Sequence, residues 1–107
     1  MSVAKKYIDA VNRADIDALM GLFAPTASLK HPAGTFTDPA ALRQFYETVV
    51  FTGQAVTDIE AQFRDGDTEI VQIRASSPLG EPGHFVYAAD IFTVRDGLIE
   101  RLEIYYR

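Results

Sequence analysis

The chain has 107 residues, enough for a single core, and we expect one domain over residues 1–107. Its net charge of −5 and its lack of any basic run argue against nucleic acid or an anionic membrane as a partner. Because the sequence has no cysteine, disulfides, thiolate zinc sites and redox thiols are excluded.

Two helices are predicted at the N-terminus. Ser2 can cap the first, which has apolar residues at helical spacing, Tyr7 among them. This helix is amphipathic, unlike a signal peptide, and no apolar run reaches the roughly 20 residues of a membrane span, so we expect a cytoplasmic protein. Asp15 can cap a second, shorter helix, with Phe23 in its buried stripe and Pro25 at its end.

The middle of the chain predicts a short strand and a third helix. The strand covers residues 27–31, and Pro32 breaks the chain after it. The third helix ends at Gly53, and its inward face includes Tyr46 and Val49.

The second half of the chain predicts an antiparallel meander with tight turns. Its strands cover residues 55–64, 68–76, 84–94 and 98–106. Uninterrupted alternation puts Ile59, Ala61 and Phe63 on one face of the first of these strands. In the last strand, alternation puts four apolar or aromatic residues on one face: Leu98, Leu102, Ile104 and Tyr106.

Asp90 is the one charged residue in the apolar segment FVYAADIFTV, residues 85–94. Alternation puts it on the same face as Ala88 and Phe92, where a carboxylate loses water at a large cost unless it is paired or protonated. Two interpretations follow. Asp90 is either a functional acid inside a pocket or an aspartate at a bulge or strand edge that faces solvent.

The order of the elements, helix-helix-strand-helix followed by four strands, indicates an α+β fold. Three helices can cover one face of a curved antiparallel sheet, which makes a cone with an apolar interior suited to a small molecule. The outer face of the sheet still carries apolar residues such as Tyr87 and Ile91, so we expect a second copy to cover it in a homodimer.

Four stretches of the sequence resemble the NTF2-like superfamily and, more narrowly, its SnoaL-like and ketosteroid-isomerase-like branch. They are YIDAVNRADIDALMGLFAPTASL, HPAG, ALRQFYETVV and DIFTVRDGLIERLEIYY, and together they span essentially the whole chain. The resemblance implies the NTF2-like cone, a curved antiparallel sheet wrapped around three helices. It constrains the activity less, because this fold carries isomerases, cyclases, hydrolases, dehydratases and non-catalytic binders.

Within this branch the chain resembles the bacterial steroid Δ5-3-ketoisomerases most, and this resemblance implies a catalytic site. It maps an oxyanion-hole tyrosine to Tyr7, a protonated aspartate donor to Asp90 and a supporting tyrosine to Tyr46. The general base of the family, an aspartate before a proline, is replaced here by His31 before Pro32. This replacement is the main departure from the family pattern.

These residue types suit proton transfer next to the carbonyl of a small apolar substrate. Tyr7 and a protonated Asp90 can stabilise the charge that develops on the carbonyl oxygen, and His31, with an ordinary pKa of about 6.5, can serve as the base. Four apolar residues are expected to bind the substrate: Phe23, Phe92, Leu102 and Ile104. We expect no cofactor, and with two histidines and no H-E-x-x-H spacing we expect no metal site.

Other interpretations stay open. A polyketide-cyclase-like aldol catalyst uses similar acid–base residues, so the sequence does not separate a steroid from a polyketide-like substrate. The departure at His31 favours a third interpretation, a non-catalytic dimer that binds a small ligand. Each candidate residue also has a structural interpretation, with Tyr7 and Tyr46 as core aromatics and His31 as a loop residue at the open edge of the sheet.

Overall fold

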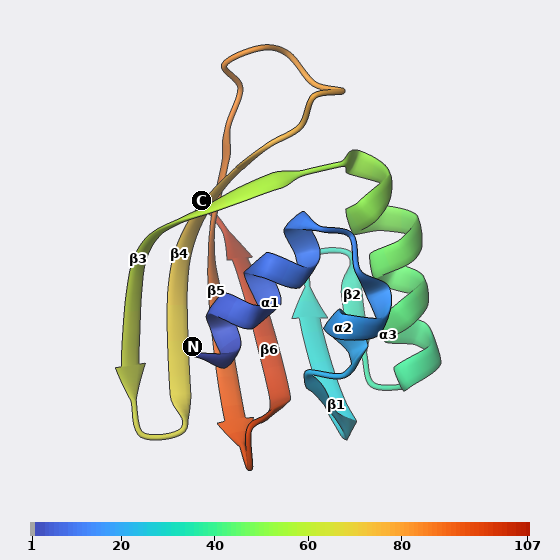
Figure 1. Ribbon diagram of the computed structural model, residues 1–107, viewed down its shortest axis with the longest axis vertical. Coiled ribbons are helices and arrows are strands. Elements are labelled where there is room, and N and C mark those ends of the chain that lie inside the picture. The colour runs from blue at the N-terminus through green and yellow to red at the C-terminus, as the bar shows by residue number, and fades with distance from the viewer. Residues whose placement is uncertain (1) are drawn as a thin grey trace.

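A computed structural model describes residues 2–107 and shows helices packed on one face of a six-stranded sheet. The helices are α1 (Val3–Asn12), α2 (Ile16–Met20) and α3 (Pro39–Phe45). The strands are β1 (Phe23–His31), β2 (Gly34–Phe36), β3 (Val56–Asp65), β4 (Thr68–Ser76), β5 (Val86–Arg95) and β6 (Leu98–Tyr106). Helix α1 crosses the face of the sheet, and α3 lies on the side of β1 and β2 (Figure 1). The predicted α+β class is confirmed.

The first two helices begin at the capping residues that the sequence predicts. The side chain of Ser2 accepts a hydrogen bond from the backbone N–H of Lys5, and that of Asp15 accepts one from Ala18. Each bond satisfies one of the N–H groups that the first turn of a helix leaves unpaired. The capping pattern therefore sets where both helices start.

The end of α2 and the start of β1 differ from the prediction. Helix α2 ends at Met20, and both Phe23 and Pro25 lie in β1 instead of in or directly after this helix. Strand β1 pairs with β6 at Phe23 and again from Ser28, with the ladder interrupted between these two residues. Because proline has no backbone N–H to donate, it is tolerated in this interrupted stretch.

The strand order in the sheet is β2-β1-β6-β5-β4-β3. All neighbouring strands run antiparallel except β1 and β6, which run parallel. Strand β2 was not predicted. It pairs with the end of β1, with His31 opposite Gly34 across the turn formed by Pro32 and Ala33. Its three residues are too few to show an alternating pattern in the sequence.

A β-bulge in β3 changes which of its side chains face the core. The register with β4 shifts between Ile59 and Ala61. Ile59 therefore packs against the core, whereas Phe63 pairs with Ile70 on the outer face and is 55% exposed. The prediction that Ile59 and Phe63 share a face is wrong, because the extra residue inverts the alternation after it.

A second bulge has the same effect in β6. Thr93 and Val94 are adjacent in β5, but their partners in β6 are not adjacent, so β6 has one extra residue at this point. Ile99 therefore faces the core together with Leu102. Leu98, which was expected on this face, pairs with Arg95 at the end of the strand. The predicted grouping of Leu98 with Leu102 is therefore wrong for the same physical reason.

Helix α3 continues into a π-helical turn (Tyr46–Val50) and a 3₁₀ turn (Phe51–Gly53). Tyr46 is fully buried, as predicted, but Val49 is 52% exposed. The prediction that Val49 faces inward assumes a regular α-helical period, which the wider π turn does not follow.

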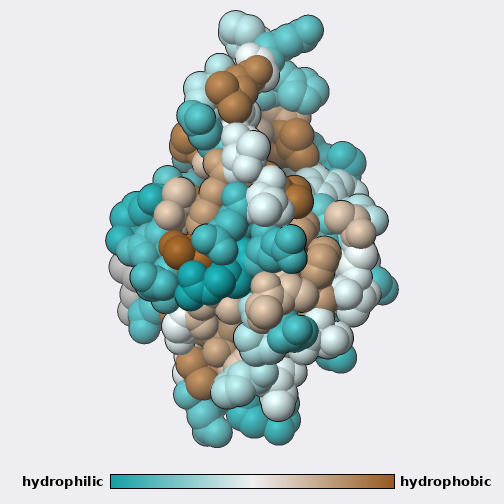
Figure 2. All heavy atoms as spheres, turned by 90° about the vertical axis from the view of Figure 1, so that its right-hand side faces the viewer, coloured by the Kyte–Doolittle hydropathy of each residue, from teal (hydrophilic) through white to brown (hydrophobic). Residues whose placement is uncertain are grey.

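The core lies between the helices and the inner face of the sheet. Its largest fully buried side chains come from both layers: Tyr46, Phe92, Leu19, Leu29, Leu42, Ile99, Leu102 and Val71. On the α3 side of the surface, hydrophobic atoms are scattered among polar ones, and the β4–β5 connection protrudes at the top (Figure 2). Of the helices formed by residues 2–107, none has the length and apolar character that crossing a membrane requires.

Candidate active site

An open cavity of about 260 Å³ lies between α1 and the inner face of the sheet. Most of its wall is apolar. The apolar residues come from α1, from α3 and the segment that follows it, and from the strands of the sheet: Ile8, Val11, Phe45, Val50, Ala55, Ile73, Ala75, Val86, Ala88 and Ile104. Five residues bring polar groups to it: Tyr7, His31, Thr57, Asp90 and Tyr106. A concave apolar surface with a few polar groups is the usual form of a small-molecule site.

Asp90 is the buried carboxyl group of this cavity. It lies in the middle of β5, opposite Val71 on β4 and Ile104 on β6, and is only 2% exposed. Its Oδ1 atom is buried without a hydrogen-bond partner. Burial raises the pKa of Asp90 to about 7, because the carboxylate loses its hydration. The interpretation in which Asp90 faces solvent is therefore wrong.

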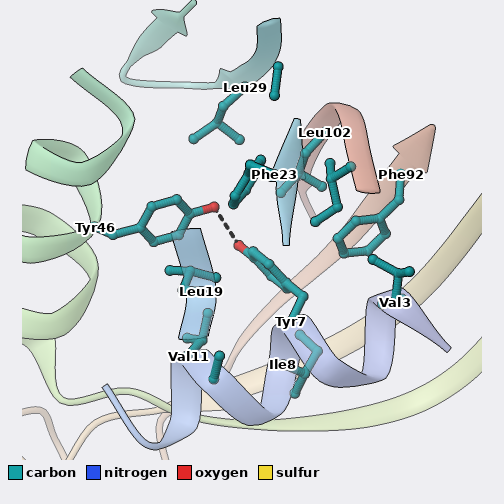
Figure 3. Close-up of a cluster of buried hydrophobic side chains, with 14 of the residues drawn as sticks. Val3, Tyr7, Ile8, Val11, Leu19, Phe23, Leu29, Tyr46, Phe92 and Leu102 are labelled. Atoms are coloured by element: carbon teal, nitrogen blue, oxygen red, sulfur yellow. Dashed lines mark hydrogen bonds between the residues drawn. The ribbon is translucent and has the colours of Figure 1, made fainter. Parts of the chain in front are cut away.

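Tyr7 and Tyr46 form a buried pair. Their hydroxyl oxygens lie 2.8 Å apart, and the side chains point toward each other from α1 and from the π turn after α3 (Figure 3). The ring of Tyr7 packs edge-on against Phe23 and Phe92. Burial, with the proximity of Tyr46 and Asp90, holds the pKa of Tyr7 well above its usual value. Tyr7 therefore stays a neutral hydroxyl group that can donate a hydrogen bond.

His31, the last residue of β1, contacts Tyr106 at the end of β6. The Nε2 atom of His31 lies 3.0 Å from the Tyr106 hydroxyl, and the backbone N–H of Ala33 donates to Nδ1 at 3.0 Å. The imidazole also packs against the ring of Phe45, with 4.9 Å between the centroids. Partial burial lowers the pKa of His31, so the neutral ring predominates at pH 7.

The four residues predicted to be catalytic come close together in the fold. Tyr7, His31 and Asp90 line the cavity, and Tyr46 lies behind Tyr7. Sequence reasoning did not include Tyr106 among the site residues. Its position two residues after Ile104 was a usable signal, because alternation puts both side chains on one face of β6.

The four residues predicted to bind the substrate divide into two groups. Ile104 lines the cavity. Phe23, Phe92 and Leu102 lie in the core and do not line it, with exposures of 7%, 0% and 0%. Phe23 and Phe92 instead pack around the Tyr7 ring. The apolar wall that a ligand would contact comes largely from aliphatic residues, many of them as small as Ala75 and Val86.

Two polar contacts, one buried and one partly buried, hold α1 over the cavity. At its N-terminus, Glu69 of β4 is 3% exposed and accepts a hydrogen bond from the N–H of Ala4 at 3.1 Å. A carboxylate at this end also complements the helix dipole. At the C-terminus of α1, Asn12 binds the backbone of Thr57 in β3. These contacts fix the helix that carries Tyr7.

The helices and the curved, unclosed sheet define the NTF2-like cone fold, which comparison with solved structures confirms. A candidate polyketide cyclase from Sinorhizobium meliloti is 29% identical, with a TM-score of 0.85 over 95% of this chain and 92% of that one. A candidate ketosteroid isomerase from Kribbella flavida is 19% identical, with a TM-score of 0.84 over 98% and 75%. SalBIII, an epoxide hydrolase/cyclase-like enzyme of pyran ring formation in salinomycin, is 23% identical, with a TM-score of 0.83 over 98% and 88%.

The SnoaL-like domain model matches residues 4–102, so the chain belongs to the SnoaL-like domain family. A search of the curated proteins finds no match. The resemblance seen in the sequence is thereby confirmed at the level of family and fold.

Proposed function

We propose that this protein is an enzyme that moves a proton next to the carbonyl group of a small apolar substrate, as a steroid Δ5-isomerase does. The observation that carries the proposal is the buried carboxyl group of Asp90, whose Oδ1 has no partner on the wall of a mostly apolar cavity. Structural carboxyl groups buried to this degree are usually paired, because an unpaired one destabilises the fold. A perturbed acid in a cleft is typical of a catalytic site.

The proposed chemistry uses Asp90 and Tyr7. With a pKa of about 7, Asp90 is present at neutral pH both as a carboxylate and as an acid. The carboxylate takes a proton from the carbon next to the carbonyl, the C–H electron pair forms a C=C bond, and the carbonyl oxygen gains the negative charge. Tyr7 donates its O–H to that oxygen. In a β,γ-unsaturated ketone the new C=C bond is conjugated with the existing one, so the acid form of Asp90 can return the proton to the γ-carbon while the remaining C=C bond moves next to the re-formed carbonyl, which completes an isomerisation.

This assignment differs from the one that the family resemblance implies, in which His31 is the base and Asp90 an oxyanion donor. The basic lone pair of a neutral imidazole is on its unprotonated nitrogen, and Nδ1 of His31 already accepts the N–H of Ala33. Its other nitrogen, Nε2, faces the hydroxyl of Tyr106. Because both nitrogens have partners within the protein, we assign the proton transfer to Asp90.

The size of the cavity favours a compact substrate. Pockets for drug-sized ligands have volumes of roughly 300–1,000 Å³. The cavity here, at about 260 Å³, lies just below that range. A carbonyl compound with one or two rings fits this volume better than a four-ring steroid.

An aldol cyclisation of a polyketide-like molecule is the second candidate function. The 29% identity to the candidate polyketide cyclase from Sinorhizobium meliloti favours it. This reaction begins with the same proton abstraction, so it uses Asp90 and Tyr7 in the same way. The carbanion then attacks a second carbonyl of the substrate instead of regaining a proton at carbon, and the oxygen of that carbonyl takes the proton back from Asp90.

Proton exchange tests the shared first step without knowledge of the product. Small cyclic ketones are incubated with the protein in D₂O, and loss of their α-protons is followed by NMR. We expect the wild-type protein to catalyse exchange and Asp90→Asn to slow it by about 10²-fold or more, with an unchanged circular dichroism spectrum. Glu69→Gln is the matched control, since it removes a buried carboxyl group that does not line the cavity but keeps a side-chain oxygen that can accept the N–H of Ala4.

Two outcomes would contradict this assignment. Exchange that is unchanged in Asp90→Asn would exclude Asp90 as the proton-transfer group. Binding of the ketones without any exchange in the wild-type protein would support the non-catalytic ligand-binding module instead.

We also propose that a second copy of the chain covers the outer face of the sheet. This face carries apolar and aromatic side chains from β3 to β6: Phe63, Ile70, Tyr87, Ile91 and Tyr105. Of these, Phe63 is 55% and Tyr105 44% exposed. Exposed apolar surface of this kind favours protein association, and two identical faces can pair about a two-fold axis.

A further inference from the structure

Tyr106 is a polar residue of the cavity that the proposed reaction does not use. It lies opposite Ala88 of β5, and half of its surface is exposed. Its hydroxyl group is 3.0 Å from Nε2 of His31, and the two rings meet edge to face with 5.4 Å between their centroids. The contact joins the ends of β1 and β6, the one parallel pair of strands in the sheet.

The turn after β1 decides which nitrogen of His31 carries the hydrogen. The backbone N–H of Ala33 can only donate, so Nδ1 must be the unprotonated nitrogen that accepts it. A neutral imidazole has one N–H, which is therefore on Nε2 and points to the Tyr106 hydroxyl oxygen. Since that oxygen accepts the bond from His31, the O–H of Tyr106 is left to donate to another acceptor.

We infer that Tyr106 donates this hydrogen bond to a second oxygen of the substrate, and that His31 is the positioning residue that orients the Tyr106 hydroxyl. The inference rests on the proposed function for the first oxygen, the reacting carbonyl at Tyr7 and Asp90. It deepens that function by naming the substrate class, an apolar compound with two oxygen acceptors, such as a diketone. It also gives His31 a role that needs its N–H group and not its basicity.

Binding of two matched probes tests the substrate class. The probes are decalone, a bicyclic monoketone, and decalindione, a diketone of the same skeleton, and each is titrated by NMR. We expect the wild-type protein to bind decalindione about tenfold more tightly, as one net hydrogen bond would give. Tyr106→Phe should lose this preference while its Kd for decalone is unchanged.

Three results of this titration would overturn the inference. One is equal affinity of the wild-type protein for both probes, and another is a preference that persists in Tyr106→Phe. If neither probe binds, the proposed substrate class is wrong and the inference fails with it.

The role of His31 is tested by two substitutions that differ in one property. A glutamine can present an amide N–H near the position of Nε2 but cannot act as a base, whereas an alanine can do neither. We therefore expect His31→Gln to keep most of the preference for decalindione and His31→Ala to lose it. An equal loss in both variants would contradict the positioning role.

The protonated nitrogen of His31 can be observed without any ligand. Nitrogen-15 NMR of histidine-labelled protein reports which ring nitrogen carries hydrogen, and His84→Gln assigns the signals because the chain has only two histidines. We expect the Nε2–H form of His31 at neutral pH. The Nδ1–H form would overturn the inference even if proton exchange is observed. The Nε2–H form and the probe preference, found together with no exchange of any ketone, would reject the proposed reaction but support Tyr106 as a binding residue.

Discussion

The side chain of Asn12 binds both backbone polar groups of Thr57. The Nδ2 group of Asn12 donates to the C=O of Thr57, and the N–H of Thr57 donates to Oδ1 of Asn12, each at 2.8 Å. Strand β3 is at the edge of the sheet, so no strand pairs with it on this side. The last residue of α1 therefore satisfies groups that a neighbouring strand would otherwise bind, and this contact ties the helix to the cavity wall.

Asn12→Ala should lower the free energy of unfolding by about 1–3 kcal/mol, because it removes two partly buried hydrogen bonds to the backbone of Thr57. Urea unfolding followed by circular dichroism measures this change. Arg13→Ala is the matched control at the next position, where exposed ion pairs with Asp9 and Asp15 are each worth at most about 1 kcal/mol. Equal losses in the two variants would show that the Asn12 contact adds nothing to stability.

Tyr7→Phe and Tyr46→Phe should differ in their effect on proton exchange. Tyr7 lines the cavity, so loss of its O–H should slow the reaction by about 10²–10³-fold. Tyr46 acts through its 2.8 Å contact with Tyr7, so its loss should slow the reaction about tenfold or less. Each variant should lose about 1 kcal/mol of stability. A larger kinetic effect of Tyr46→Phe than of Tyr7→Phe would contradict the assignment of Tyr7 as the donor.

The stability of the protein should fall as the pH rises from about 4 to about 7. In the unfolded chain, Asp90 loses its proton near its ordinary pKa of 3.8, whereas in the folded protein it keeps the proton until about 7. The stabilisation by protonation is therefore fully present below the lower value and is lost by the upper one, a change of roughly 4 kcal/mol. Urea unfolding at several pH values should show that the free energy of unfolding changes less with pH in Asp90→Asn, because asparagine has no titratable group. An identical pH dependence in the two proteins would contradict the raised pKa.

Ile91→Lys should separate the proposed dimer into monomers. Ile91 lies in β5 on the outer face of the sheet, opposite Ile70 of β4, so a lysine puts a charge into the proposed interface. Sedimentation equilibrium should give twice the chain mass for the wild-type protein and the single mass for the variant. Val49→Lys adds the same charge at an exposed position outside the sheet and should stay dimeric. A monomeric wild-type protein would exclude the dimer.

The elements with strong local patterns could be predicted from the sequence. Strands β4 and β6 have the predicted bounds, because the turns at Gly66 and Gly97 set where they start. Both glycines have positive φ, a conformation that glycine adopts more easily than other residues. Alternation also placed Asp90 on the same face as Phe92, since no bulge lies between them, but it left open whether the carboxyl group was buried or faced solvent.

The remaining features depend on contacts between distant parts of the chain. The bulges in β3 and β6 and the π turn at Tyr46 each change the side-chain period at one residue, and hydrophobic patterning does not report such a change. The partners of His31 were unpredictable for the same reason. Its contact with Tyr106 requires the parallel pairing of β1 with β6, and a sequence read in order suggests no such pairing.

That parallel pairing also has a consequence for how the protein folds. Strand β1 lies between β2 and β6. Leu29 can pair early with Phe36 of the nearby β2, but its pairing with Leu102 of β6 needs a residue far along the chain. Closing so long a loop costs chain entropy and slows folding. During synthesis, β1 therefore leaves the ribosome long before β6 exists. The cavity, with His31 on one of these strands and Tyr106 on the other, is assembled only when the last strand of the sheet has been made.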